Sequence, residues 1–283
     1  MSNTRSLALT ALLALALSLP ACAQAEAPSA PATPAASASP AAEAPAVEIR
    51  TQRVEYIHNG QVLEGYLAYN PALSSLRPGV LVIHEWTGIN PYIESRARQL
   101  AEMGYVAFAP DIYGKGVRPQ PPAAAQEAGK YYGDRELAKG RLTAGLNVLR
   151  EQNNVDPERL AAIGYCFGGT MALELARSGA DLQGFVSFHG GLNPTENEGR
   201  NIQGKVLVLH GANDPFVSQE SIDGFKAEMN TGNVDWQMVY YSGAVHAFTN
   251  PDSGNDNSTG AAYNADADRR SWEAMKSFFA EIF

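Results

Sequence analysis

Cysteine is scarce in this chain, which has only Cys22 and Cys166 among 283 residues. Because Cys22 lies in an apolar N-terminal segment of its own, the remainder of the chain holds a single cysteine and cannot form an internal disulfide, even in an oxidising compartment. Cys166 must therefore persist as a free thiol. This suggests that it occupies a recessed site.

Positive charge is also in short supply, with 21 Lys and Arg against 30 Asp and Glu and a formal net charge of -9. No basic cluster interrupts this balance, so we expect neither a nucleic-acid partner nor an anionic membrane surface. Closely spaced metal ligands are missing too: there is no H-x-x-x-H pair, and the Asp- and Asn-rich segment 252–257 lacks EF-hand spacing. We therefore expect no metal and no cofactor, and interpret residues 252–257 as a solvated insertion.

The apolar run at residues 7–19 is too short to span a bilayer. Arg5 precedes it and small residues surround Cys22, which is typical of a secretory signal. We expect residues 1–23 to be a signal peptide and the protein to be exported. Leu19-Pro20-Ala21-Cys22 also resembles a bacterial lipobox, which leaves two forms open: a free periplasmic protein, and an envelope lipoprotein that meets the membrane through a lipid on Cys22.

Residues 24–48 are almost entirely Ala, Pro, Ser and Glu. Such a composition buries too little apolar surface to order itself, so we interpret this segment as a flexible linker. Residues 49–283 are sufficient for one large α/β domain, which we expect to be a monomer.

Two apolar segments, 54–57 and 62–68, flank His58-Asn59-Gly60. Asn-Gly in that position predicts a β-hairpin, and makes His58 a turn residue without chemistry. A Pro- and Ala-rich connection is expected at 118–125. Elsewhere along the chain, strands alternate with helices. Strands are predicted at 79–83, 105–109, 160–163, 184–188, 205–209 and 235–241, and helices at 92–103, 136–150, from 170 onward, 218–230 and 266–279. This order predicts an α/β fold with a mostly parallel sheet, right-handed crossovers and an antiparallel pair at the start.

The segment Gly164-Tyr165-Cys166-Phe167-Gly168-Gly169 lies between a predicted strand and a predicted helix. It is the cysteine version of the nucleophile elbow G-x-S-x-G, in which glycines let the strand and helix approach each other closely. The elbow would hold the thiol at the carboxyl end of the sheet, facing a cleft. It would also place the Phe167 N–H at a helix N-terminus, which favours both a thiolate and a developing oxyanion. A buried structural cysteine beside a packing turn is the alternative.

Two residues further along favour the catalytic interpretation. A thiol nucleophile needs a base and a third group that orients the base. Cys166, Asp214 and His246 follow the nucleophile, acid, histidine order of the α/β-hydrolase fold, and Asp214 and His246 each come after a predicted strand. The competing bases are His84, His189 and His210, none of which lies after the acid. Asp111 is the rival acid, but it precedes Cys166 and is more typical of a turn cap.

Together these residues resemble the dienelactone hydrolase family over residues 54–283. The resemblance is carried by G-x-C-x-G-G, Glu85, Pro-Asp-Ile-Tyr-Gly at 110–114, the Asp214 turn and His246-Ala247-Phe248. It implies a triad of Cys166, Asp214 and His246. It also implies an oxyanion hole formed by the backbone N–H groups of Phe167 and Trp86, and a Glu85 carboxylate that pairs with the resting cysteine.

In the family, arginines hold the carboxylate of the dienelactone substrate. At the matching positions this chain has Lys115, which can attract an anion as a point charge, and Asn250, which carries no charge. We further expect Trp86, Tyr113 and Phe248 to line the pocket. The expected partner is therefore a small ester or lactone, cleaved through a thioester acyl-enzyme. A carboxylesterase or thioesterase with the same machinery, and a non-catalytic binding module of the same fold, are the alternatives.

Overall fold

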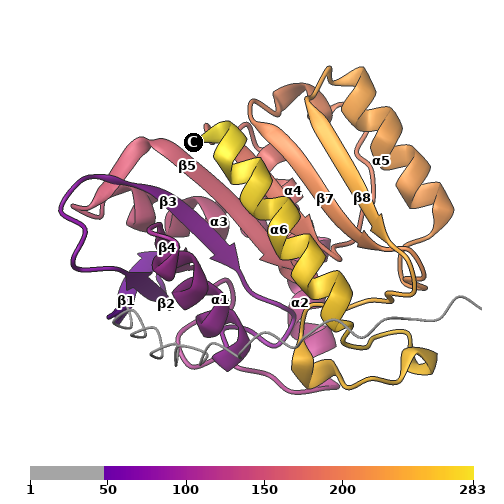
Figure 1. Cartoon of the computed structure of the whole chain (residues 1–283), viewed down its shortest axis with the longest axis horizontal. Coiled ribbons are helices and arrows are strands. Elements are labelled where there is room, and N and C mark those ends of the chain that lie inside the picture. The colour runs from indigo at the N-terminus through magenta and orange to yellow at the C-terminus, as the bar shows by residue number, and fades with distance from the viewer. Residues whose placement is uncertain (1–47) are drawn as a thin grey trace, which may run out of the picture. The chain divides into compact units, whose positions relative to one another are not determined.

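An eight-stranded sheet in the order β1-β2-β4-β3-β5-β6-β7-β8 runs through the computed structural model, which describes residues 48–283 (Figure 1). The predicted signal peptide and all but the last residue of the predicted linker lie outside the described residues. The strands are β1 Arg50–His58, β2 Gln61–Tyr69, β3 Arg77–Ile83, β4 Val106–Ala109, β5 Val155–Tyr165, β6 Gly184–Phe188, β7 Lys205–Gly211 and β8 Trp236–Tyr241.

The sheet is parallel from β4 through β3 to β8, and antiparallel where β1 pairs with β2 and β2 with β4. In the hairpin turn Asn59 and Gly60 have φ angles of 49° and 76°. Two successive positive φ values match the right-handed twist of a tight hairpin, which is why Asn-Gly predicts this turn. The predicted α/β-hydrolase fold and its antiparallel N-terminal pair are confirmed.

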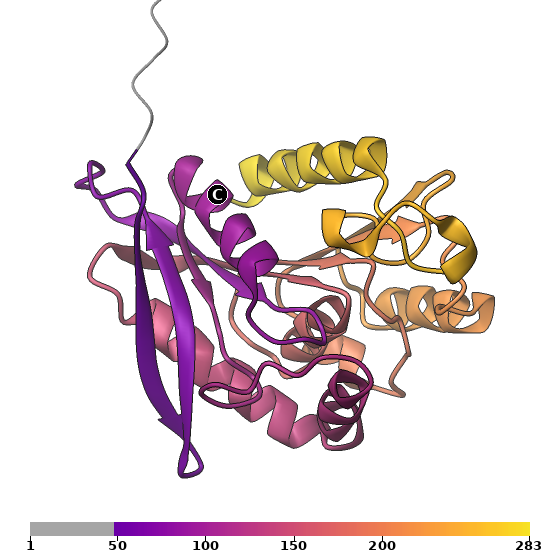
Figure 2. The ribbon, with the colours of Figure 1, turned by 90° about the horizontal axis from the view of Figure 1, so that it is seen from below.

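Between residues 48 and 283, six α-helices cover the two faces of the sheet. They are α1 Pro91–Glu102, α2 Ala123–Gly133, α3 Arg135–Arg150, α4 Phe167–Arg177, α5 Gln219–Thr231 and α6 Ala265–Ile282, with short 3-10 turns at η1 Glu198–Asn201, η2 Pro251–Ser253 and η3 Asn257–Thr259. Helices α1 and α6 pack on one face, against side chains such as Val80 and Ile163. Helices α2 to α5 pack on the other face, against Leu81 and Ala162, as the side view shows (Figure 2). Successive residues of the inner strands thus feed two cores, which explains their continuous apolar runs.

Helix α2 is absent from the elements expected from the sequence. Its segment follows Pro121 and Pro122, and this proline content favoured an irregular connection. The helix begins immediately after the prolines, at Ala123, and buries Ala124, Ala128 and Tyr131. Proline interrupts only the interior of a helix, so a proline pair just before the first turn is compatible with one.

Parallel strands end at the same edge of the sheet, and four of the segments beyond those ends carry the residues singled out by the sequence. Glu85 and Trp86 follow β3, Cys166 follows β5, Asp214 follows β7 and His246 follows β8. Ligands of open α/β sheets bind outside the carboxyl ends of the strands. No helix among residues 48–283 is both long and apolar enough to cross a membrane.

Candidate active site

Cys166 occupies a strained turn between β5 and α4. Its φ and ψ angles are 55° and -116°, a backbone conformation rare for a residue with a side chain. The turn closes because glycines flank it: a Cβ on Gly164 would lie 1.9 Å from the Gly168 carbonyl oxygen, and a Cβ on Gly168 would lie 2.2 Å from the Ile83 carbonyl oxygen. The two glycines of G-x-C-x-G are therefore sterically required, and the elbow presses against the end of β3.

The structure brings Cys166, His246 and Asp214 into hydrogen-bond contact. The Nε2 atom of His246 lies 3.1 Å from the Cys166 Sγ atom, and its Nδ1 atom lies 2.8 Å from the Asp214 Oδ2 atom. Asp214 is itself fixed by its turn, since its Oδ1 atom accepts the Phe216 N–H at 2.9 Å. The imidazole thus bridges a thiol and a buried carboxylate, which is the geometry of a nucleophile, its base and the group that orients the base.

The charges at this site reinforce one another. Burial lowers the pKa of His246, but the negative charges of Cys166 and Asp214, together with its hydrogen bonds to both, raise that pKa to about 10. Asp214 therefore stabilises the positively charged form of the ring, which is placed to take up the proton of the Cys166 thiol. The thiolate is the nucleophilic form of cysteine.

The backbone N–H groups of Phe167 and Trp86 have no acceptor within residues 48–283. Phe167 directly follows Cys166 in the chain, and Trp86 lines the same cleft as Cys166. Phe167 is the first residue of α4, where amide groups point out of the helix and carry its partial positive charge. The carbonyl oxygen of Trp86 accepts a hydrogen bond of 3.0 Å from the Tyr113 hydroxyl, which fixes the loop after β3.

Glu85 is buried beside the triad, with 5% of its surface exposed. Burial raises the pKa of its carboxyl group to about 7, although a hydrogen bond of 2.8 Å from the Asn250 amide lowers it in part. The expected pairing of Glu85 with Cys166 is not found: within the described chain the thiol contacts His246 and the carboxylate contacts Asn250. The structure thus has the thiol already engaged by its base.

A cleft of about 1040 Å³ opens in front of Cys166. Its lining includes the expected residues Glu85, Trp86, His246 and Asn250. A smaller depression of about 560 Å³ beside His58 and α3 contains none of these residues, so we assign function to the cleft.

Three residues expected at the substrate are placed elsewhere, which corrects the expectation from the sequence. Lys115 is an exposed side chain that pairs with Glu55 and lies 3.8 Å from a Glu64 carboxylate oxygen, on the surface of the hairpin. Tyr113 is buried, with its ring packed against Phe167. Phe248 is fully buried against His189. None of the three lines the cleft. Lys115 is held by its ion pair on the hairpin, and the rings of Tyr113 and Phe248 are packed in the core.

Two of the competing histidines, His84 and His210, are buried and do not line the cleft. His84 is fully buried, its pKa is lowered to about 4 by burial, and its Nε2 atom accepts the Ile112 N–H. His210 is buried as well, and burial lowers its pKa. Asp111 caps its turn as expected, accepting the N–H groups of Tyr113 and Gly114. Among residues 48–283 no three His, Cys, Asp or Glu side chains are arranged to hold a metal ion.

His189 has a role that the sequence did not reveal. The Cys166 N–H is shared between the Phe188 carbonyl oxygen, at 3.0 Å, and the His189 Nδ1 atom, at 3.1 Å. The His189 Nε2 atom lies 2.7 Å from the Thr249 hydroxyl. Because Nδ1 accepts, the ring proton must be on Nε2, and burial lowers the pKa well below its usual value. A neutral imidazole therefore supports the backbone of the elbow. Its place at the end of β6, one strand from the elbow, was the available signal.

Arg135 and Glu174 also line the cleft, and neither was expected there. Glu174 follows Phe167, Thr170 and Met171 at helical spacing on α4, so it shares their face. That spacing was readable in the sequence, whereas the position of Arg135 depends on the unexpected helix α2 before it.

The chain resembles several known proteins. A model of the dienelactone hydrolase family matches residues 63–283. A solved dienelactone hydrolase-like promiscuous phosphotriesterase from metagenomic libraries is 40% identical, with a TM-score of 0.80, and the match covers 83% of this chain and 99% of that one. An Aquifex aeolicus protein named as a carboxymethylenebutenolidase is 29% identical over 70% of this chain and 87% of its own length. A Bradyrhizobium protein named as a 2-oxo-3-(5-oxofuran-2-ylidene)propanoate lactonase is 31% identical over 67% and 80%.

Proposed function

The chain belongs to the dienelactone hydrolase family and is an ester or lactone hydrolase, and on that premise we propose that it cleaves a small carboxylic ester or lactone through a thioester on Cys166. One observation carries the proposal: the His246 ring lies within hydrogen-bond distance of both the Cys166 sulfur and the Asp214 carboxylate. A thiol, an imidazole and a carboxylate in series are the parts that covalent acyl transfer requires.

The reaction follows from the contacts of His246. Its ring takes the proton of the Cys166 thiol, and the resulting thiolate attacks the carbonyl carbon of the substrate. As the tetrahedral intermediate collapses, His246 Nε2–H gives its proton to the leaving oxygen and a thioester remains on Cys166. A water molecule then gives a proton to His246 and attacks the thioester, which releases the acid, and the proton on His246 returns to the Cys166 sulfur.

The unpartnered N–H groups of Phe167 and Trp86 are suited to the oxyanion of the intermediate. Phe167 directly follows Cys166 and Trp86 lines the same cleft, so both N–H groups are free to bind a carbonyl oxygen there as it develops charge. A single donor of this kind is worth about 3 kcal/mol of transition-state stabilisation.

Carboxylesterase or thioesterase activity with the same residues is the near alternative, and a binding module without turnover is the distant one. For location, we propose export to the periplasm or envelope, on the leader-like composition of residues 1–23.

The test is turnover of p-nitrophenyl acetate by the purified protein and by its Cys166→Ala variant. We expect an initial burst of p-nitrophenol, an acetylated Cys166 in rapidly quenched samples, and loss of both in the variant. A Ser253→Ala variant in the same cleft serves as the matched control and should still form the acyl-enzyme. Equal rates for wild type and Cys166→Ala would remove the nucleophile from the proposal. Turnover of lactones but not aryl esters would distinguish a lactone hydrolase from the near alternative, a carboxylesterase.

A further inference from the structure

The charged side chains that line the catalytic cleft are mostly carboxylates. Besides His246, Arg135 is the only cation among the lining residues of the described chain, against Glu174, Asp252 and Glu85, the last with its pKa raised to about 7 by burial. We propose that the cleft selects uncharged esters or lactones and discriminates against substrates whose acyl or leaving group carries a carboxylate. The inference rests on the proposed function and names its substrate class.

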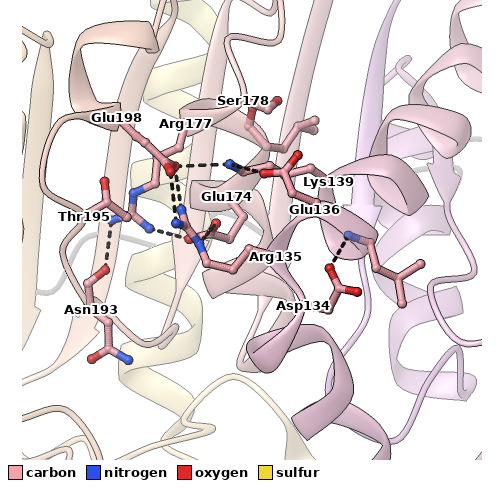
Figure 3. A network of polar contacts seen from close by, with 12 residues as sticks. Asp134, Arg135, Glu136, Lys139, Glu174, Arg177, Ser178, Asn193, Thr195 and Glu198 are labelled. Atoms are coloured by element: carbon pink, nitrogen blue, oxygen red, sulfur yellow. Dashed lines mark hydrogen bonds and ion pairs between the residues drawn. The ribbon is translucent and has the colours of Figure 1, made fainter.

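Arg135 cannot serve as a carboxylate-binding group in this state, because its guanidinium is already occupied (Figure 3). Its Nε–H donates to Glu174 at 2.6 Å, and its two terminal nitrogens donate to the two oxygens of Glu198, with Nη1 at 3.0 Å. The planar fork that would bind a substrate carboxylate therefore binds a carboxylate of the protein instead.

The two carboxylates that bind Arg135, those of Glu174 and Glu198, are also bound by other cations of the protein. Arg177, 1% exposed, donates to Glu174 at 2.8 Å and makes two further bonds to Glu228. Glu198 also accepts from Lys139 at 3.2 Å. A substrate anion would have to displace Glu174 or Glu198 from Arg135, and the displaced carboxylate would then keep only its second cation, Arg177 or Lys139.

The segment of the cleft lining at Asn250 and Asp252 offers no positive charge either. The amide nitrogen of Asn250 donates to Glu85 at 2.8 Å, and its amide oxygen accepts the Asp252 N–H at 2.9 Å. The Asp252 side chain is exposed and has no cationic partner within residues 48–283. Lys115, the residue expected to attract an anion, lies outside the cleft. An incoming carboxylate would therefore meet unneutralised negative charge.

What the cleft does offer is apolar surface. Three large side chains that face it are unusually exposed: Trp86 at 36%, Tyr132 at 49% and Phe216 at 63%. Exposed aromatic groups in a concave site bind by burying apolar area on the ligand. This lining favours an uncharged aromatic or aliphatic group on the substrate.

Two esters that differ in one charge test the inference: para-acetoxybenzoate and its methyl ester. Each kcat/KM is divided by the rate of spontaneous hydrolysis, which removes the difference in leaving group. We expect the normalised kcat/KM to be about tenfold or more lower for the anion, and the gap to narrow with added salt. Equal values, or faster turnover of the anion, would overturn the inference while leaving the proposed hydrolase intact. No Cys166-dependent turnover of either ester would instead overturn the proposed function, and the inference with it.

Two substitutions assign the discrimination to named groups. Asp252→Asn removes the unpaired carboxylate, and Glu198→Gln loosens the occupied fork of Arg135 from outside the cleft. Each should raise the ratio of anionic to neutral kcat/KM several-fold. Glu273→Gln, the same charge change on the exposed face of α6, should leave the ratio unchanged. If both variants match Glu273→Gln, the cleft charges do not set the preference and the inference is wrong.

Discussion

Replacing Glu85 with glutamine should stabilise the protein at alkaline pH. Glu85 is almost completely buried, and its hydrogen-bonding neighbour is the neutral amide of Asn250. Glutamine has the same shape and offers an amide oxygen to that neighbour, but it never carries a charge. The substitution therefore removes the desolvation cost of an ionised carboxylate while it keeps the packing.

The size of the effect follows from the pKa. Burial raises the pKa of Glu85 from its ordinary value of 4.5 to about 7, so between these pH values the folded protein keeps a proton that the unfolded chain has lost. The stability of the wild type therefore falls as pH rises through this window. A shift of this size corresponds to about 3 kcal/mol once the carboxylate is fully ionised, above pH 7. Below pH 4.5 both states are protonated and this advantage of glutamine disappears.

The assay is urea denaturation of wild type and Glu85→Gln across this pH range, with Glu273→Gln as the control for the loss of one carboxylate. We expect the two stability curves to diverge as pH rises, with Glu85→Gln higher by about 3 kcal/mol at the alkaline end. A constant difference at every pH, or a variant that is less stable above pH 7, would show that Glu85 is not a buried group held against ionisation. Steady-state turnover of Glu85→Gln would show whether the Glu85 carboxylate, whose ionisation lowers stability, contributes to catalysis.

Two further predictions concern the scaffold. Gly164→Ala should destabilise the protein by at least about 3 kcal/mol or abolish folding, because its Cβ would lie 1.9 Å from the Gly168 carbonyl oxygen. Gly129→Ala on α2 has open space around it and should instead stabilise the protein by about 1 kcal/mol. Thermal unfolding of the pair measures both, and similar melting temperatures would contradict the steric argument. Arg177→Met should cost about 3–5 kcal/mol, because it leaves buried Glu228 without a counter-ion and Glu174 with Arg135 alone. Chemical denaturation measures this cost, and a variant as stable as wild type would show that the buried charges are dispensable.

Much of the architecture can be read from the sequence because its signals are local. Asn59-Gly60 predicts the hairpin, apolar runs mark the buried strands, and the glycines around Cys166 predict the elbow. The boundaries are less well defined: α4 begins at Phe167 rather than Thr170, and β5 begins five residues before the apolar run that identifies it. The first turn of a helix and the exposed end of a strand carry no periodicity, so a pattern detects them late.

The sequence by itself determined the order of the elements and the placement of Cys166, Asp214 and His246 after three strands. In a parallel sheet that placement is enough to bring them to one edge, since all of those strands end there. Only the tertiary structure decided which charged groups reach the cleft. Lys115 is held by Glu55 and Arg135 by Glu198, partners about sixty residues away in the chain. Ion pairing and burial depend on distances in space, and no local pattern encodes them.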